Sequence, residues 1–128
     1  MVDNIWKFKV FVRDNQVCDF EDWIKDQTTE DRAKIRIFIN RLMIMDSWPP
    51  KLVLPLTNNS KINELRIKGK KVQLRPLGCH GPGRKEFTLL IGAKEQGDSF
   101  VPKDAPLRAR ERRDLIMANG ERYTKDYE

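Results

Sequence analysis

The N-terminal segment alternates apolar and polar residues with the period of a β-strand. The pattern covers residues 5–13, where one side carries Trp6, Phe8, Val10 and Val12 and the other carries Lys7, Lys9 and Arg13. This alternation is typical of a strand with one buried face. After a turn, residues 19–26 place Phe20, Trp23 and Ile24 at helical spacing behind acidic residues, which predicts a short helix.

A second helix is predicted to begin after Thr28 or Thr29, either of which can cap it. Its apolar stripe, at spacings of three and four residues, consists of Ile35, Phe38, Ile39, Leu42 and Met43. Ile37, Ile44 and Met45 widen the stripe, so we expect the helix to be deeply packed or partly covered by a partner. Residues 47–50, SWPP, end it because proline cannot continue a helix.

Three strand patterns follow a linking loop at residues 51–60. They cover residues 62–69, 71–77 and 86–93, and the short links between them predict antiparallel hairpins. The first two strands have one polar side each, and these sides together carry Glu64, Arg66, Lys68, Lys71, Gln73 and Arg75. The third strand is continuously apolar, so we expect it to be covered on both faces.

The rest of the chain is expected to form a loop (95–102), a last helix (104–117) and a tail (119–128). Leu107, Leu115 and Ile116 give that helix only a thin apolar stripe. The order of elements predicts an α+β fold. In it, a small antiparallel sheet made of the N-terminal strand and a three-strand meander packs with two N-terminal helices and a C-terminal helix. The length and the absence of repeats predict one domain, residues 1–128.

Positive charge is concentrated in one block of the chain. Residues 61–94 carry nine Lys or Arg against two acids, Glu64 and Glu86, and the whole chain has a net charge of +6. The remaining residues are nearly balanced. If the block folds into one sheet, its exposed face suits a polyanion, and we expect nucleic acid.

Most other chemistries lack the residues they need. Cys18 and Cys79 follow no metal spacing, and His80 is the only histidine, so we expect no metal site and no cofactor. Residues 78–87, GCHGPGRKEF, lack Walker spacing and are interpreted as a turn, with Arg84 and Lys85 extending the basic surface and His80 a loop residue able to touch RNA. No apolar run is long enough to span a membrane, and the N-terminus does not resemble a secretion signal. We therefore expect a cytoplasmic protein.

Four segments in this order resemble the RelE/ParE superfamily of bacterial toxins, and most closely its HigB-like, phage-derived branch. They are INELRI, GKKVQLR, FTLLIGAKE and FVPKDAPLRARERR, and the resemblance covers roughly residues 5–117. It implies the toxin of a toxin–antitoxin pair, neutralised by a small antitoxin that we expect to be of helix-turn-helix type. The best-known activity of the family is ribosome-dependent mRNA cleavage, while a related branch poisons DNA gyrase.

The resemblance assigns the catalytic face to Arg66, Lys68, Lys71, Arg75 and Lys94. RNA cleavage by a 2′-hydroxyl needs a base, an acid and cations to stabilise the phosphorane, and no metal. Lys68 or Lys71 is the expected base or acid, because crowding by like charges depresses a lysine pKa. Tyr123 and Tyr127 would reach the site only if the tail folds back.

Two functions therefore remain open. The first is a metal-independent endoribonuclease that acts on mRNA in the ribosome. The second is a non-catalytic protein of the same fold: a gyrase inhibitor, or a module that binds nucleic acid or a partner. The family's tyrosine in the basic strand is replaced here by Leu74 or Leu77, and the aromatic after the last strand is Phe100, which favours the second reading. The dense cationic face favours the first.

Overall fold

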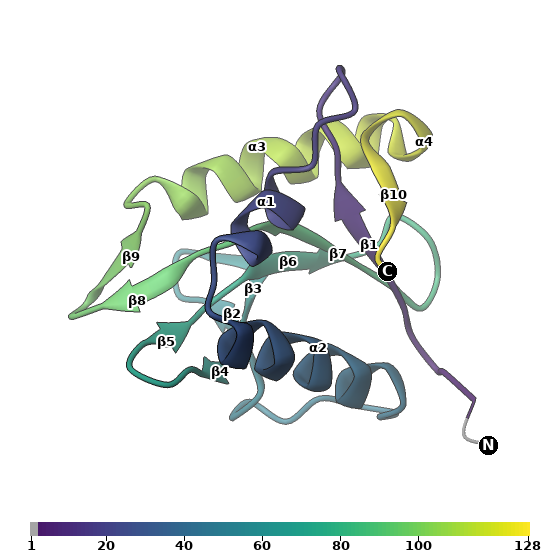
Figure 1. The fold of residues 1–128 in the computed structure, drawn as a ribbon. Helices are drawn as coiled ribbons and strands as arrows, with labels where there is room; N and C mark the ends of the chain where they lie inside the picture. Colours follow the sequence, from purple (N-terminus) through teal and green to yellow (C-terminus); the bar gives the residue numbers. More distant parts are fainter. Residues whose placement is uncertain (1–2) are drawn as a thin grey trace.

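The computed structural model describes residues 3–128 and has the expected α+β architecture (Figure 1). Its helices are α1 (Asp19–Lys25), α2 (Thr29–Met43), α3 (Ala105–Ala118) and the short α4 (Gly120–Tyr123). Its strands are β1 (Lys7–Phe11), β2 (Val53–Leu56), β3 (Asn59–Leu65), β4 (Ile67–Lys68), β5 (Gln73–Leu74), β6 (Leu77–His80), β7 (Glu86–Ile91), β8 (Lys94–Gln96), β9 (Ser99–Val101) and β10 (Thr124–Asp126).

The strands form two hydrogen-bonded sheets, and the chain crosses from one sheet to the other three times. The six-stranded sheet has the order β10-β1-β7-β6-β3-β2, and the four-stranded sheet has the order β4-β5-β8-β9. Only β1 and β7 are parallel; the other neighbours are antiparallel. The chain passes from one sheet to the other where β3 leads to β4, β5 to β6, and β7 to β8. Gly92 lies at the third of these junctions, where a Cβ would come within 2.0 Å of the Trp23 ring.

Helices cover the six-stranded sheet on both faces (Figure 1). One apolar core joins α1 and α2 to the sheet and includes Phe8, Phe20, Ile35, Ile39 and Leu42. The other lies under α3 and includes Ile62, Leu77, Leu90, Ala109 and Ile116. The central strand β7 contributes to both cores, which confirms the prediction that it is covered on two sides.

Side chains hold α2 near both of its ends. The Thr28 hydroxyl accepts a hydrogen bond from the backbone N–H of Asp31 at 3.1 Å, as expected of an N-cap. After the helix, the indole N–H groups of Trp48 and Trp6 donate to the carbonyls of Leu42 and Met45, at 2.9 and 3.0 Å. The two tryptophans thereby tie the last turn of α2 and the chain just after it to the residue before β1 and to the segment that follows the helix.

The buried apolar positions of α2 and α3 differ from the predicted ones. Ile37 and Ile44, expected to widen the buried stripe of α2, are 62% and 44% exposed. On α3, Leu107 and Leu115 are exposed, and the buried positions are Ala105, Ala109, Arg112 and Ile116. Small alanines let α3 lie close to the sheet, and the helix turns its larger leucines outward.

The two segments expected to be loops contain strands. Residues 51–60 include β2, which pairs with β3; Pro55 is tolerated there because β2 is an edge strand. Residues 95–102 include a hairpin of β8 and β9, whose turn places Gly97 at φ +61°, a conformation that glycine adopts readily.

The expected tail is also ordered. Residues 119–128 form α4 and β10, and β10 adds to the sheet beside β1 with Val10 opposite Lys125. Tyr127 packs against the core under α2, and Tyr123 packs against the core under α3. Two aromatic anchors within a polar segment provide the apolar burial that the prediction missed.

Candidate functional site

Two arginines and two glutamates lie together where the two sheets meet. Arg66 Nη1 donates to Glu64 Oε1 at 2.6 Å, and Arg75 Nη2 lies 3.7 Å from Glu95 Oε2. Glu64 belongs to β3, Arg66 follows it, Arg75 follows β5, and Glu95 belongs to β8. We call these four residues the charge cluster. It holds two positive and two negative groups, so its own net charge is close to zero.

Arg75 is buried at the centre of the charge cluster, with a 5% exposed surface. Its Nη1 donates to the carbonyl of Leu74 at 3.0 Å, and its Nη2 donates to Gln73 Oε1 at 3.3 Å. Burial lowers the pKa of the guanidinium, as does the positive charge of Arg66, while Glu95 and Glu64 oppose that shift. Its Nε has no hydrogen-bond partner within residues 3–128. The prediction that Arg75 belongs to an exposed cationic face is therefore wrong, because the backbone carbonyls around it hold the side chain inside.

The strand register decides which of the predicted site residues share a face. Lys68 lies opposite Gln73, Gln73 opposite Glu95, and Glu95 opposite Phe100. Residues directly opposite in a sheet point to the same side, so Lys68 shares a face with the carboxylate that pairs with Arg75. Lys94 lies opposite Leu74, which belongs to the core under α2, and so points to the other face.

Four lysines nevertheless line one groove at the end of the four-stranded sheet. This basic groove has a volume of about 650 Å³ and is lined by Lys68, Lys70, Lys71 and Lys94, with Glu95 at its wall. The sequence predicted that Lys71 begins a strand. In the structure, Lys71 lies in the turn between β4 and β5. Three of the five predicted catalytic residues therefore line this groove: Lys68 from β4, Lys71 from the turn after it, and Lys94 from β8.

The lysine-bearing turn is held in place by α2. The buried carboxylate of Asp31 accepts a hydrogen bond from the backbone N–H of Lys70 at 3.0 Å. The Lys70 side chain also pairs with Glu30 at 3.3 Å, but both groups are more than half exposed, so that pair contributes little to stability. Asp31 is therefore the contact that fixes the turn.

A second groove opens on the carboxylates of the charge cluster. It has a volume of about 390 Å³ and is lined by Glu64, Glu95, Asp98 and Phe100, with apolar residues of β2. Glu64 is mostly buried but reaches this space, so a ligand in the groove could contact it. Glu95 lines both grooves and links them.

Sequence reasoning missed Glu64 and Glu95 as site residues. A signal existed for Glu64, because it alternates with Arg66 and Lys68 on the polar side of its strand. Glu95 carried no such signal, since it lies in a segment expected to be a loop.

The other predicted RNA-binding residues lie apart from the basic groove. His80 is the last residue of β6, not a loop residue, and Arg84 and Lys85 lie in the turn before β7. None of these three residues lines the basic groove. The turn prediction for residues 78–87 is confirmed only for residues 81–85, because strands occupy both sides.

The two cysteines and two tyrosines lie outside both grooves. Both thiols are buried: burial raises the pKa of Cys79 to about 12 and also raises that of Cys18, so neither is suited to act as a thiolate. The folded tail does not bring Tyr123 or Tyr127 into the linings of the two grooves. Within residues 3–128, no group of three or more His, Cys, Asp or Glu side chains is placed to hold a metal ion. In the same range, no helix is long and apolar enough to cross a membrane.

The chain was compared with protein families, with curated proteins and with solved structures. No family model, no curated protein and no solved structure matches it.

Proposed function

We propose that the protein is a metal-independent endoribonuclease, the toxin of a toxin–antitoxin pair that cleaves mRNA in the ribosome. The observation that carries the proposal is the charge cluster: a nearly buried carboxylate, Glu64, bonded at 2.6 Å to Arg66 and facing a groove beside a basic one. A carboxylate and two guanidinium groups supply a base and a stabiliser for a phosphorane without a metal.

The proposed reaction begins when Glu64 removes the proton from a ribose 2′-hydroxyl. The 2′-oxygen attacks the adjacent phosphorus, and Arg66 stabilises the negative charge on the phosphoryl oxygens. Arg75 is buried, so it contributes its positive charge from inside the protein without contacting the RNA. Lys68, on the same face as Glu95, donates a proton to the 5′-oxygen as its bond to phosphorus breaks. The products are a 2′,3′-cyclic phosphate and a 5′-hydroxyl, and Glu64 has gained the proton that Lys68 has lost.

The basic groove supplies the binding energy in this scheme. Lys68, Lys70, Lys71 and Lys94 surround a space next to the charge cluster, and their charges attract the phosphates that flank the cleaved bond. This division of roles explains why a charge cluster of nearly zero net charge can act on a polyanion.

A second candidate is a protein of the same fold that binds RNA or a partner without cleaving it, such as a gyrase inhibitor. One observation favours it: each arginine of the charge cluster is already paired with a carboxylate, at 2.6 and 3.7 Å. Pairs of this kind also occur where their only role is structural.

Induced expression with primer extension on cellular mRNA separates these candidates. We expect growth to stop, cuts to appear within translated codons, and Arg66→Ala to abolish both effects while the protein remains folded. Lys103→Ala is the control, because Lys103 is exposed and outside both grooves. Growth arrest with uncut mRNA would favour the gyrase inhibitor, and normal growth would remove both toxin functions.

A further inference from the structure

A group of partly exposed aromatic rings lies at the far end of β6 from the charge cluster. The ring centroids of Trp6 and Trp48 are 4.7 Å apart, and His80 lies 5.2 Å from Trp6 and 5.4 Å from Trp48, stacked on the latter. We call these three residues the aromatic platform. His80 is exposed and the tryptophans are partly exposed, so ring surface remains open to a ligand.

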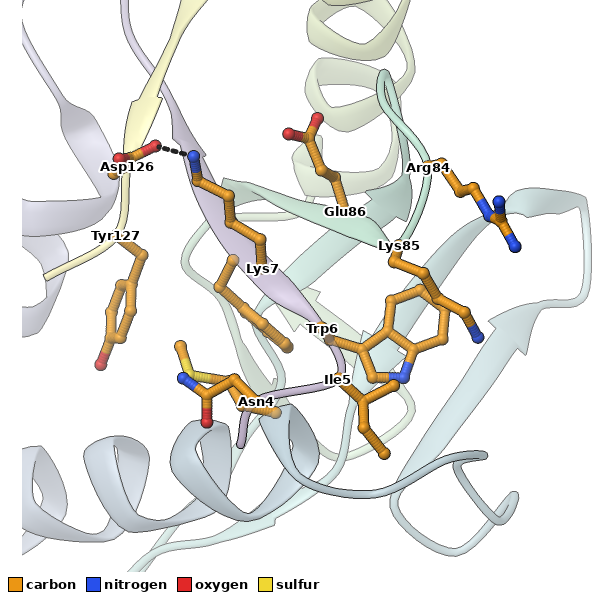
Figure 2. Close-up of a pocket in the computed structure, with 11 residues that line it drawn as sticks. Asn4, Ile5, Trp6, Lys7, Arg84, Lys85, Glu86, Asp126 and Tyr127 are labelled. Atoms are coloured by element: carbon orange, nitrogen blue, oxygen red, sulfur yellow. Dashed lines mark ion pairs between the residues drawn. The ribbon is translucent and has the colours of Figure 1, made fainter. Parts of the chain in front are cut away.

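Cations adjoin the aromatic platform. Lys85 Nζ lies 4.7 Å from the centroid of the Trp6 ring, a cation–π distance. Figure 2 shows the Lys85 side chain against the Trp6 indole and the Arg84 guanidinium extended away from the chain. Lys7 is directed elsewhere, toward Asp126 at 3.3 Å. The platform therefore offers flat rings next to two exposed positive groups.

The backbone at Lys85 favours a different residue. Its φ of +58° lies in the left-handed region, where glycine and asparagine are more stable than lysine. The main chain there is fixed by the Lys7 N–H, which donates to the Lys85 carbonyl at 2.9 Å. A lysine at this position costs stability in the turn, and its side chain is directed to the Trp6 ring, so we infer that its role lies at the aromatic platform.

The state of His80 suits stacking. The rings around it remove water and lower its pKa, which keeps the imidazole neutral at pH 7. A neutral imidazole stacks as an aromatic ring and keeps one donor and one acceptor for the edge of a base.

We propose that the aromatic platform, with Lys85 and Arg84, is a second binding site for single-stranded RNA, in which an unpaired base stacks on the rings and a phosphate contacts the two cations. The proposal rests on RNA being the ligand of the proposed function, but it does not require cleavage. Aromatic rings beside cations are the general means by which proteins hold single strands without reading their sequence. His80 ends β6, and the first residue of that strand, Leu77, pairs with Glu64 of the charge cluster. The two sites are therefore roughly 10 Å apart along the strand, and the platform would hold a nucleotide next to the cleaved bond.

Tryptophan fluorescence tests this site directly. The chain has three tryptophans, so a Trp23→Phe background leaves only the two of the platform as reporters. The probe is a short 2′-O-methylated oligouridylate, which cannot be cleaved through a 2′-hydroxyl and so measures binding alone. We expect the probe to quench the fluorescence, and polyphosphate of similar charge to bind without quenching.

Two variants keep both tryptophans and their indole hydrogen bonds to Met45 and Leu42 and change only the residues beside the rings. Lys85→Asn and His80→Ala are each expected to weaken binding of the probe about tenfold, and Lys85→Asn is expected to unfold at the same or a higher denaturant concentration than the parent. Lys103→Asn, which removes a distant exposed cation, should bind like the parent.

Three results would overturn the proposal: an unquenched signal, unchanged affinity in both variants, or equal quenching by polyphosphate. Each of these could occur while mRNA cleavage persists. Conversely, quenching that depends on His80 and Lys85 in a protein that cuts no mRNA would leave this site standing and remove the nuclease.

Discussion

Glu64→Gln is expected to slow RNA cleavage by about 10²–10⁴-fold, the usual contribution of a general base. Glutamine keeps the shape of the side chain and can still accept a hydrogen bond from Arg66, which lies 2.6 Å away in the native protein. It cannot take the proton of a 2′-hydroxyl. The fold and the groove should therefore persist while the chemistry is lost.

The measurement is the initial rate at which fragments appear when purified protein is added to ribosomes translating a defined message. Glu121→Gln is the matched control, because it makes the same exchange at an exposed position on α4. Glu64→Gln is expected to lower the denaturant midpoint, because it removes the charge that pairs with Arg66, while the protein stays folded under the assay conditions; Glu121→Gln should match the parent. A Glu64→Gln protein that cleaves at the parental rate would show that another group is the base.

Arg112→Ala is expected to lower the free energy of unfolding by about 3 kcal/mol. Arg112 on α3 is 8% exposed; its Nη1 donates to the Leu90 carbonyl at 2.8 Å and its Nη2 pairs with Asp19 at 2.8 Å. It thereby joins α3 to β7 and to α1. Breaking a buried pair costs about 3–5 kcal/mol. The lower end applies because Arg13 still pairs with Asp19, at 2.7 Å.

Urea unfolding of the purified variants measures this difference. Arg108→Ala is the control on the same helix: its pair with Asp104 is also 2.8 Å long, but both side chains are about half exposed. An exposed pair contributes about 0–1 kcal/mol, so Arg108→Ala should change stability little. If both variants lost the same free energy of unfolding, burial would not determine how much each arginine contributes to stability.

The periodic parts of the sequence predicted the architecture well. Alternation in residues 5–13 and the stripe through Ile35, Ile39 and Leu42 depend only on which face is buried, so β1 and α2 were found from the sequence. The continuous apolar run of β7 likewise indicated a strand covered on both sides. These patterns are local, and tertiary contacts reinforce them.

The failures occurred where a distant contact outweighs local composition. The polar segment 119–128 is ordered because Tyr123 and Tyr127 reach the two cores, and Arg112 is buried because it meets Asp19 and Leu90. The spacing of residues along the chain identifies neither the core contacts of the tyrosines nor the partners of Arg112.

The candidate site was only partly predictable for the same reason. The sequence indicated a basic meander, but the exposure of each cation depends on register and on backbone carbonyls. Arg75 is inside, Lys94 points to the opposite face from Lys68, and Glu95 joins the site through a hairpin that had no sequence signal. That His80, Arg84 and Lys85 contact RNA stays a prediction. The tryptophans beside them were not predicted as site residues, because Trp6 lies on the apolar side of its strand and Trp48 carried no signal beyond the end of a helix.

The central claim is that RNA is cut by its own 2′-hydroxyl at the charge cluster. The most direct test is the chemistry of the fragment ends in mRNA from cells expressing the protein. The account predicts 2′,3′-cyclic phosphates and 5′-hydroxyls at the cuts, both absent in cells expressing Glu64→Gln. Fragments with 3′-hydroxyls and 5′-phosphates, or cyclic ends that persist in the Glu64→Gln cells, would contradict it.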